Sequence, residues 1–197
     1  MITNNIFYTD VPVLEKQFCE NLIGRFENDP NKHPGVVGID STESKLKKST
    51  DLYLSNKYKN ETSIFFASLY DTLDVYGSLL EDDNPTLKFI FRRSNSLISG
   101  FQMQRTLPGE YFHWHSDDLY DPPYYRGLTY IFYLNDVKNG GQTEFNDGTI
   151  IQPKQGHCLV FPATWTYIHR GVPPVDETKY IVTGWWYTDT QISCATL

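Results

Sequence analysis

The sequence predicts an α+β protein in which two N-terminal helices buttress a C-terminal β-domain. In two segments before about residue 82, apolar residues recur every three or four positions, the spacing of one helix face. From about residue 87, short segments rich in Val, Ile, Phe, Tyr and Thr alternate with Gly, Pro, Asn and Asp. Many short strands separated by turn residues are typical of a sandwich or barrel. A 15% aromatic content also favours strands.

The first helix is expected to begin near Asp10 and Pro12, because Asp caps helices and Pro fits their first turn. Its apolar face consists of residues spaced by four: Leu14, Phe18, Leu22 and Phe26. The turn-forming sequence D-P-N-K-H-P-G at 29–35 is expected to end the helix. Residues 36–61 are polar and contain K-L-K-K at 45–48. We expect a solvated loop there, with a substrate-contacting loop as the alternative.

The second helix and the strands follow in order. Apolar residues three or four positions apart form one face of this helix: Phe65, Leu69, Leu73, Tyr76 and Leu80. Such a face predicts that the helix packs against a sheet. The predicted strands are LKFIF (87–91), LISGFQMQRT (97–106), LTYIFYL (128–134), TIIQP (149–153), HCLVF (157–161) and KYIVTGWWY (179–187). No linker or repeat divides the chain. Residues 1–197 are therefore expected to form a single domain, helical over about 10–82 with a β-core over about 87–190.

Composition restricts the function classes. A formal charge of −7 and a pI of about 5.1 argue against a nucleic-acid partner, which usually requires a basic face. Cys19, Cys158 and Cys194 are widely spaced and odd in number, which predicts reduced thiols in an intracellular protein. The N-terminus lacks the pattern of a secretory signal, and no apolar run approaches the roughly 20 residues that span a bilayer. We therefore expect a cytoplasmic, soluble protein with no membrane partner.

Residues 111–118, Y-F-H-W-H-S-D-D, indicate part of a metal site. In a strand, His115 and Asp117 point to the same side, so both can bind one ion. A third ligand must come from elsewhere, and His157 and His169 are both candidates, whereas His33 lies in a Pro-flanked loop. Two histidines and one carboxylate leave one face of the metal open, as in non-haem Fe(II) oxygenases. A closed zinc site usually takes four protein ligands, which the cysteine spacing does not supply.

Further motifs, in a fixed order, extend this pattern. They are P-G-E-Y-F-H-W-H-S-D (108–117), R-G-L-T-Y-I-F-Y-L-N (126–135), G-G-Q-T-E-F (140–145), P-K-Q-G-H-C-L-V-F (153–161) and I-H-R-G-V-P-P-V-D-E-T-K-Y (168–180). In this order the chain resembles the 2-oxoglutarate- and Fe(II)-dependent dioxygenases, specifically their prolyl 4-hydroxylase-like branch, over roughly residues 97–187. A weaker similarity lies in K-K-S-T-D-L at 47–52. The resemblance implies a double-stranded β-helix, that is, a jelly-roll, cupin-like core.

The resemblance assigns the metal ligands. It implies that His115, Asp117 and His169 bind Fe(II), and that His157 is structural. His113 and Asp118 flank the site, and the resemblance assigns no role to either of them.

The resemblance also implies how 2-oxoglutarate binds. Lys179 would pair with the distal carboxylate of 2-oxoglutarate, and the hydroxyl groups of Tyr133 and Thr183 would also contact it. Trp185 would form one wall of the pocket. Many relatives carry a Tyr a few residues before the Gly of the first motif. Here R-T-L-P precedes Gly109, so either Arg105 or Thr106 substitutes or the contact is missing.

The reaction implied is hydroxylation of a C–H bond by O2, with decarboxylation of 2-oxoglutarate to succinate and CO2 and with ascorbate keeping the iron reduced. The expected substrate is a proline-containing protein or peptide. A free amino acid or small metabolite is the enzymatic alternative, and a catalytically silent jelly-roll binding module is the alternative from another class. Arg126 is either a structural partner of a carboxylate or a substrate contact. The oligomeric state does not follow from the sequence.

Overall fold

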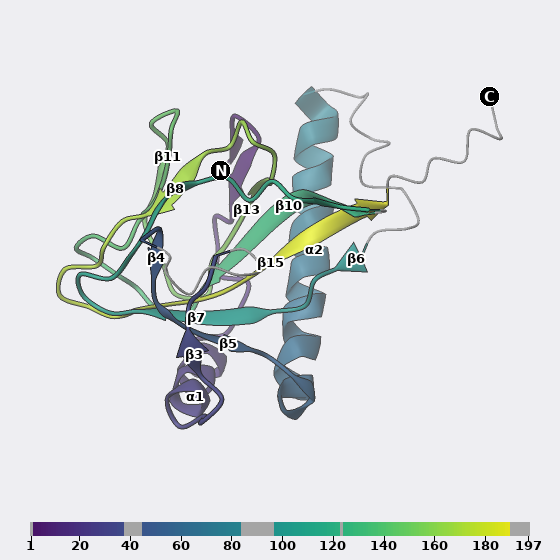
Figure 1. The fold of residues 1–197 in the computed structure, drawn as a ribbon. Coiled ribbons are helices and arrows are strands. Elements are labelled where there is room, and N and C mark those ends of the chain that lie inside the picture. Colours follow the sequence, from purple (N-terminus) through teal and green to yellow (C-terminus); the bar gives the residue numbers. More distant parts are fainter. Residues whose placement is uncertain (1, 38–44, 84–96, 123, 190–197) are drawn as a thin grey trace.

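The computed structural model describes residues 2–37, 45–83, 97–122 and 124–189, in which helices pack against a pair of β-sheets (Figure 1). The helices are α1 (Lys16–Glu27), the short 3-10 helix η1 (Asn56–Tyr58) and α2 (Lys59–Asp83). All paired strands run antiparallel. The smaller sheet contains, in spatial order, β12 (Ile150–Ile151), β11 (Thr143–Phe145), β14 (His169–Gly171), β8 (Tyr111–His115) and β4 (Lys47–Lys48).

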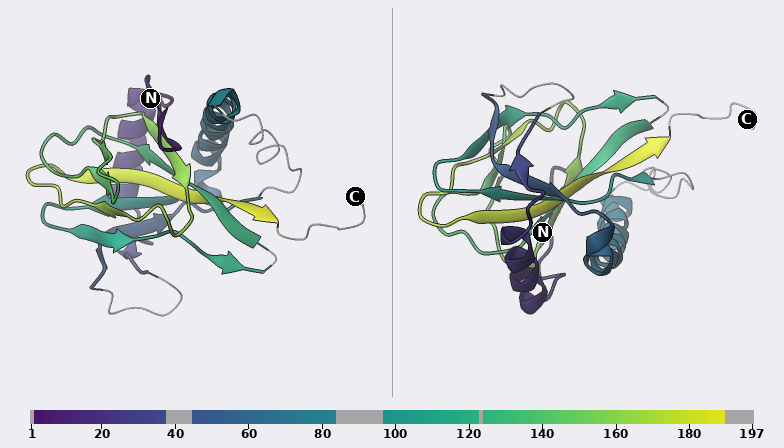
Figure 2. Two further views of the ribbon diagram at one scale, coloured as in Figure 1. Left: turned by 90° about the horizontal axis from the view of Figure 1, so that it is seen from above. Right: turned by 60° about the horizontal axis from the view of Figure 1, so that its bottom comes forward.

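The larger sheet carries the helices on its outer face (Figure 2). In spatial order it contains β1 (Ile2–Thr3), β2 (Ile6–Tyr8), β13 (Cys158–Pro162), β10 (Tyr124–Tyr133), β15 (Lys179–Asp189), β7 (Gln102–Thr106), β5 (Thr50–Tyr53) and β3 (His33–Pro34). Two short strands join it beside this path: β6 (Leu97–Ile98) pairs with β15 and β9 (Tyr120–Asp121) pairs with β10.

Strand alternation on β10 separates two apolar clusters. Tyr130 and Phe132 point towards the helices and pack in the same cluster as Phe65 of α2. Ile131 and Tyr133 point the other way, into the cluster between the two sheets. This alternation follows from the period of two in a strand. It leaves the inner face of the larger sheet free to line a cavity against the smaller sheet.

The first helix begins later than predicted. We expected a start near Asp10 and Pro12, but α1 begins at Lys16. The chain before it is extended: β2 pairs with β13, and the amide of Thr9 donates to the carbonyl of Cys158 at 3.0 Å. The amides of Val13 and Leu14 then donate to the carbonyl of Gly156, so this segment is held by the chain around β13 before the helix starts.

The prediction of a solvated loop over 36–61 is wrong for most of the segment that the structure describes. β4 joins the smaller sheet, β5 joins the larger one, and α2 already begins at Lys59. Asp51 is 0% exposed and Leu52 is 3% exposed. The charge of Asp51 is neutralised locally by Lys47, and this pairing allows a polar sequence to be buried. Residues 38–44 lie outside the described part.

The predicted strands are otherwise confirmed, with two exceptions. LKFIF at 87–91 lies outside the described residues. The segment 97–106 divides into β6 and β7 at Gly100, whose φ is +86°. A Cβ at Gly100 would lie 2.2 Å from the hydroxyl oxygen of Tyr53, so glycine is required at this break.

The predictions of free cysteine thiols and of no membrane-spanning helix can be compared with the described residues. Cys19 and Cys158 are buried free thiols, as expected, and Cys194 lies outside the described residues. Among the described helices, none combines the length and apolar character needed to cross a bilayer.

Candidate metal centre

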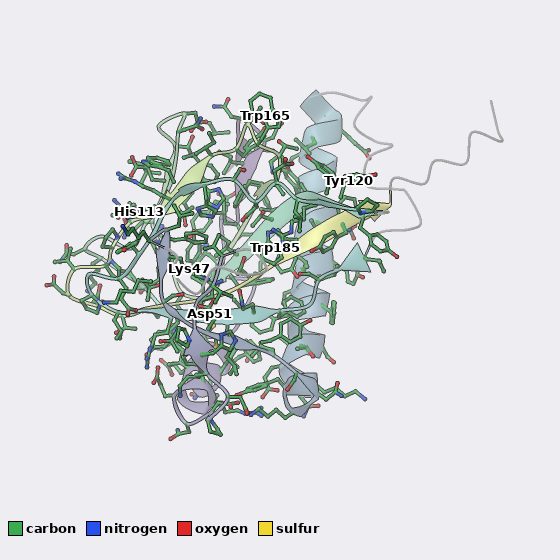
Figure 3. The ribbon with its side chains drawn as sticks, viewed as in Figure 1. Lys47, Asp51, His113, Tyr120, Trp165 and Trp185 are labelled. Atoms are coloured by element: carbon green, nitrogen blue, oxygen red, sulfur yellow. The ribbon has the colours of Figure 1, made fainter. Side chains whose placement is uncertain are left out.

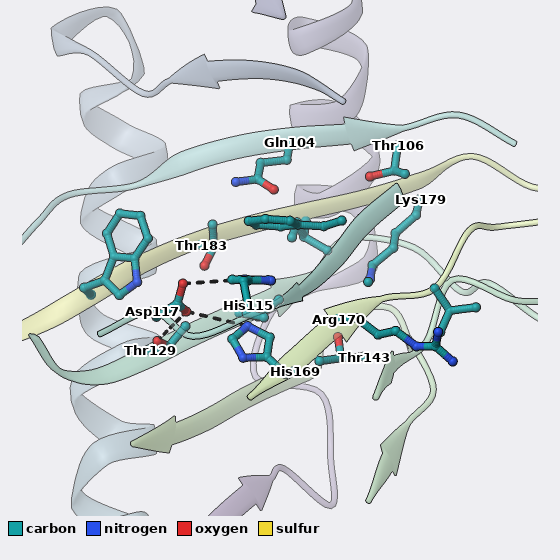
Figure 4. A pocket seen from close by; sticks show the side chains of 16 residues that line it. Gln104, Thr106, His115, Asp117, Thr129, Thr143, His169, Arg170, Lys179 and Thr183 are labelled. Atoms are coloured by element: carbon teal, nitrogen blue, oxygen red, sulfur yellow. Dashed lines mark hydrogen bonds and ion pairs between the residues drawn. The ribbon is translucent and has the colours of Figure 1, made fainter. Parts of the chain in front are cut away.

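The sheets bring His115, Asp117 and His169 together at one end of a cavity (Figure 4). His115 ends β8 and pairs in register with His169 of β14, while Asp117 lies just beyond β8. One carboxylate oxygen of Asp117 lies 3.7 Å from Nε2 of His115, and the other lies 3.7 Å from Nε2 of His169. Single donor atoms of all three residues lie within 4.8 Å of one another. The structure thus brings the predicted set together.

A β-bulge in β8 sets the direction of His115. His169 lies opposite His115 and Gly171 lies opposite Phe112, so two residues of β8 face the single residue between His169 and Gly171. Phe112 and His115 therefore both line the cavity although they are three positions apart. Their rings stack with centroids 3.5 Å apart and planes inclined by 10°. His113 is exposed and stacks on Tyr111 instead.

Backbone carbonyls hold both imidazoles in one orientation. Nδ1 of His115 lies 2.7 Å from the carbonyl oxygen of His113, and Nδ1 of His169 lies 3.0 Å from that of Tyr167. A carbonyl oxygen only accepts, so each Nδ1 donates its hydrogen. Each Nε2 then presents a lone pair towards Asp117. This arrangement is typical of histidines that bind metals.

The protonation states suit a divalent cation. Burial, together with the neighbouring His169, lowers the pKa of His115 to about 4, so this imidazole is neutral at pH 7. Burial raises the pKa of Asp117, but His169, His115 and a 2.7 Å hydrogen bond from the Thr129 hydroxyl outweigh burial and lower it below its ordinary value. Two imidazole nitrogens and one carboxylate oxygen on one side of a point are the facial triad typical of Fe(II) oxygenases. The donor set therefore fits Fe(II).

Lys179 reaches into the same cavity from the end away from Asp117 (Figure 4). Its side chain extends from β15 and the residue is 5% exposed. Burial lowers its pKa to about 8. The Nζ atom lies 5.6 Å from the ring centroid of Tyr133. A buried ammonium group in a cavity is a binding site for an anionic group, because the pair is worth more away from water.

Of the other residues predicted around Lys179, two line the cavity and Tyr133 does not. Thr183 and Trp185 line the cavity on the same face of β15, as the period of two predicts. The Thr183 hydroxyl donates to the carbonyl of Tyr130 at 2.8 Å. Tyr133 lies behind the wall, with its hydroxyl 2.8 Å from that of Thr143.

Strand faces and contacts show where the residues with open roles lie. Thr106 lines the cavity, whereas Arg105 points to the other side of β7 and pairs with Glu27 at 2.8 Å. His157 lies apart from the triad, with Nδ1 donating to the carbonyl of Thr9 at 2.8 Å, in line with a structural role. Asp118 is exposed and accepts a hydrogen bond from a tyrosine hydroxyl.

Arg126 contacts the backbone of Asp117, and its charge also helps to lower the pKa of the Asp117 carboxyl group. Its Nη1 donates to the main-chain oxygen of Asp117 at 3.3 Å, and its guanidinium carbon lies 3.6 Å from the ring centroid of Trp185.

The sequence analysis assigned no site role to several lining residues, among them Phe112, Gln104, Thr129 and Thr143. Gln104 and Thr129 follow from the alternation of β7 and β10 once one cavity-facing residue on each strand is known. Thr143 stands in G-G-Q-T-E-F, so the motif itself was a signal for it. Phe112 had no such signal, because only the bulge turns it inward.

Comparisons with known proteins agree with this geometry. Residues 101–187 match the sequence model of the 2OG-Fe(II) oxygenase superfamily. No curated protein matches the chain in sequence.

Solved structures share the fold at low identity. A viral collagen prolyl hydroxylase from Paramecium bursaria Chlorella virus-1, in its 2-oxoglutarate complex, is 19% identical with a TM-score of 0.67, covering 94% of this chain and 97% of that one. A prolyl-4-hydroxylase from Pseudomonas putida is 17% identical with a TM-score of 0.67, covering 94% of each chain. A Trichoplax adhaerens prolyl hydroxylase, in complex with a hypoxia inducible factor peptide fragment, is 17% identical with a TM-score of 0.69, covering 99% and 88%.

Proposed function

Because residues 101–187 form a domain of the 2OG-Fe(II) oxygenase superfamily, we propose that this 2-oxoglutarate-dependent dioxygenase hydroxylates proline within a protein or peptide. The observation that carries the proposal is one cavity with His115, Asp117 and His169 at one end and the buried ammonium group of Lys179 at the other. The three prolyl hydroxylases described above share this fold, and one of them was solved with a peptide.

The strand order supports a double-stranded β-helix for the core. From β7 to β15 the chain alternates between the sheets: β7, β10, β13 and β15 belong to the larger sheet, and β8, β11, β12 and β14 to the smaller one. This crossing from sheet to sheet is what a jelly roll requires. The cavity lies between its two layers, so strands from both sheets supply its lining.

We assign a role to each group in the cavity. His115, Asp117 and His169 hold Fe(II) through Nε2, a carboxylate oxygen and Nε2. Lys179 would pair with the distal carboxylate of 2-oxoglutarate, and Thr143, whose hydroxyl is hydrogen-bonded to that of Tyr133 behind the wall, adds a polar group to the lining. When bound, Fe(II) and 2-oxoglutarate activate O2 for insertion of one oxygen atom into a C–H bond while 2-oxoglutarate becomes succinate and CO2.

The chain itself positions the reactants and excludes water. Thr129 and the backbone of His113 and Tyr167 fix the directions of the three ligands before anything binds. Apolar walls from Ile131 and Ile181 line the space between the triad and Lys179. In such a space the attraction between the ammonium group and a carboxylate is stronger than in water, which favours a small diacid in one orientation.

A surface groove beside the triad supports a peptide as the substrate. It shares Thr183 and Trp185 with the cavity and continues past Arg126 to Tyr53 and Leu119. Tyr53 is 53% exposed and Leu119 is 40% exposed, so aromatic and apolar side chains border an open groove. An extended peptide can lie along such a groove with one residue at the metal, whereas a small metabolite needs only the cavity.

The test combines an activity measurement with a product search. Purified protein with Fe(II), ascorbate and 2-oxoglutarate should release succinate slowly without substrate, and Asp117→Ala should abolish that release. A proline-containing peptide library should then yield peptides that gain one oxygen atom on proline, detected by mass spectrometry. Succinate release that responds only to free amino acids or small metabolites would replace the peptide substrate. Inert wild-type protein that still binds such peptides would indicate a silent binding module instead.

A further inference from the structure

A buried ion pair, Lys47–Asp51, lies outside the cavity lining yet close to a metal ligand. Nζ of Lys47 lies 2.6 Å from a carboxylate oxygen of Asp51, and the side chains are 4% and 0% exposed. The Ser49 hydroxyl donates to the other carboxylate oxygen at 2.7 Å. Among the Lys and Arg ion pairs of the described residues, it is the one in which both side chains are almost fully buried.

Burial of this kind is not explained by stability alone. Removing two charges from water costs about as much free energy as their attraction returns, so an apolar pair of similar volume is often as stable or more so. A Cβ at Gly35 would lie 2.1 Å from the Ser49 hydroxyl oxygen and 3.0 Å from the Lys47 side chain. The pair is therefore tightly enclosed, and its geometry is fixed by close packing on several sides.

The pair joins the two sheets at the edge of the cavity (Figure 3). Lys47 belongs to β4, which pairs with β8 of the smaller sheet, and Lys47 is in register with Phe112. Asp51 belongs to β5, which pairs with β7 of the larger sheet, and Asp51 is in register with Gln104. Phe112 and Gln104 both line the cavity. The pair thus links the strand next to β8 with the strand next to β7 at the cavity edge.

A single side chain connects the pair to the metal site. Nζ of Lys47 lies 5.2 Å from the ring centroid of Phe112. The ring of Phe112 stacks on the imidazole of His115 with centroids 3.5 Å apart. Ring stacking with this small inclination restricts rotation of the imidazole, so a shift of Phe112 moves His115 with it. Within the described residues, the imidazole of His169 contacts the rings of His115, Phe145 and Phe161 rather than that of Phe112.

We propose that the Lys47–Asp51 ion pair is a positioning device that fixes the imidazole of His115, through Phe112, in the orientation needed to bind the metal. This inference rests on the proposed function, because it concerns the same metal site. It predicts that metal affinity and the environment of His115 depend on the pair more than global stability does.

The test uses Co(II) as the metal probe and three variants. Lys47→Met removes the ammonium group, and Lys47→Met combined with Asp51→Leu replaces the whole pair by apolar side chains. Ser49→Ala removes only the hydrogen bond to Asp51. The matched control is Lys57→Met, which removes the ammonium partner of Asp29, another buried carboxylate, at a pair that does not line the cavity. Circular dichroism confirms that each variant is folded, and thermal midpoints record stability.

We expect the Kd for Co(II) to rise about 10-fold or more in Lys47→Met and in the double variant, the size typical of losing a group that supports a metal ligand. Ser49→Ala should show a smaller rise. The double variant should regain thermal stability without regaining metal affinity, since it leaves no buried charge unpaired. Lys57→Met should lose stability but keep the wild-type Kd.

Paramagnetic NMR of the Co(II)-loaded proteins gives a local readout. Both imidazoles donate from Nδ1 to backbone carbonyls, so both N–H hydrogens are protected and observable. In the double variant the His115 signal should move while the His169 signal stays in place. Unchanged affinity and an unchanged His115 signal in the double variant and Ser49→Ala would overturn this inference alone. Wild-type protein that binds no Co(II) would overturn the proposed function as well.

Discussion

Replacing Lys179 by Met should separate co-substrate binding from stability. The change removes the ammonium group but keeps a similar length and an apolar stem. In the cavity, the distal carboxylate of 2-oxoglutarate would then be buried without its cation. Breaking a buried ion pair by removing one partner costs about 3–5 kcal/mol. At a tenfold change per 1.4 kcal/mol, the Kd for 2-oxoglutarate should rise at least about 100-fold.

The same substitution should not destabilise the free protein. The pKa of Lys179 falls from its ordinary value of 10.5 to about 8 because of burial, which corresponds to about 3 kcal/mol of unfavourable free energy at neutral pH. Methionine does not carry this penalty. Lys179→Met should therefore match or exceed the wild type in thermal midpoint at pH 7, while binding 2-oxoglutarate poorly. Such a gain in stability with a loss of function is the usual trade-off at a binding site.

The pH dependence has a definite sign. Lys179 loses its proton more readily in the folded protein than in the unfolded chain, so the unfolded chain binds more protons between pH of about 8 and 10.5. Stability should rise with pH across that window in the wild type, and Lys179→Met should lack this rise. Affinity for 2-oxoglutarate should change in the opposite direction and fall above a pH of about 8, because the neutral amine must be protonated to pair with a carboxylate.

Isothermal titration with 2-oxoglutarate, in the presence of redox-inert Mn(II), measures the affinity, and differential scanning calorimetry measures the stability. Lys138→Met, at an exposed lysine, is the control and should leave both unchanged. If Lys179→Met bound 2-oxoglutarate as tightly as the wild type, the assignment of Lys179 would be wrong. If it bound weakly but was also strongly destabilised, the argument from burial would fail.

Three further predictions concern other residues. Thr129→Val removes the hydrogen bond to Asp117 and should raise the Kd for Co(II) about 10- to 100-fold; an unchanged Kd would contradict a supporting role. Gly140→Ala places a Cβ 2.2 Å from the carbonyl oxygen of Pro173 at a φ of +71° and should lower stability by about 1–3 kcal/mol or more, whereas Gly24→Ala, with open space around it, should raise stability by about 0.5–1 kcal/mol. Cys19, whose pKa burial raises to about 12, should react with iodoacetamide only after unfolding. Rapid alkylation of Cys19 in the native protein would show that this thiol becomes exposed readily.

Regular strands made part of the site predictable. Lys179, Thr183 and Trp185 stand at even spacings in one strand, so the sequence alone places them on one face, and the structure confirms it. The same rule divides β10 between the helices and the cavity. Such predictions succeed because the period of two is a property of the strand itself and needs no knowledge of its neighbours.

The rule fails where a neighbouring strand alters it. Phe112 and His115 should lie on opposite faces of a regular strand, yet the bulge against β14 turns both inward. Asp51 is an acidic residue in a polar stretch, which predicts exposure, but Lys47 and Ser49 neutralise and cap it. In the first case the deciding contact joins strands that are distant in the sequence, and in the second it joins residues of β4 and β5, two strands that enter different sheets.

The choice between His157 and His169 shows the same limit most clearly. Both histidines adjoin a short strand, so the pattern of neighbouring residues cannot separate them. Topology does: β13 lies in the larger sheet between β2 and β10, and His157 at its start bonds to Thr9, whereas β14 lies beside β8 in the smaller sheet. Only a strand paired with β8 can place an imidazole in register with His115. A metal site made from two strands is thus specified by which strands pair, and the ordered motifs were informative because they reflect that pairing across the chain.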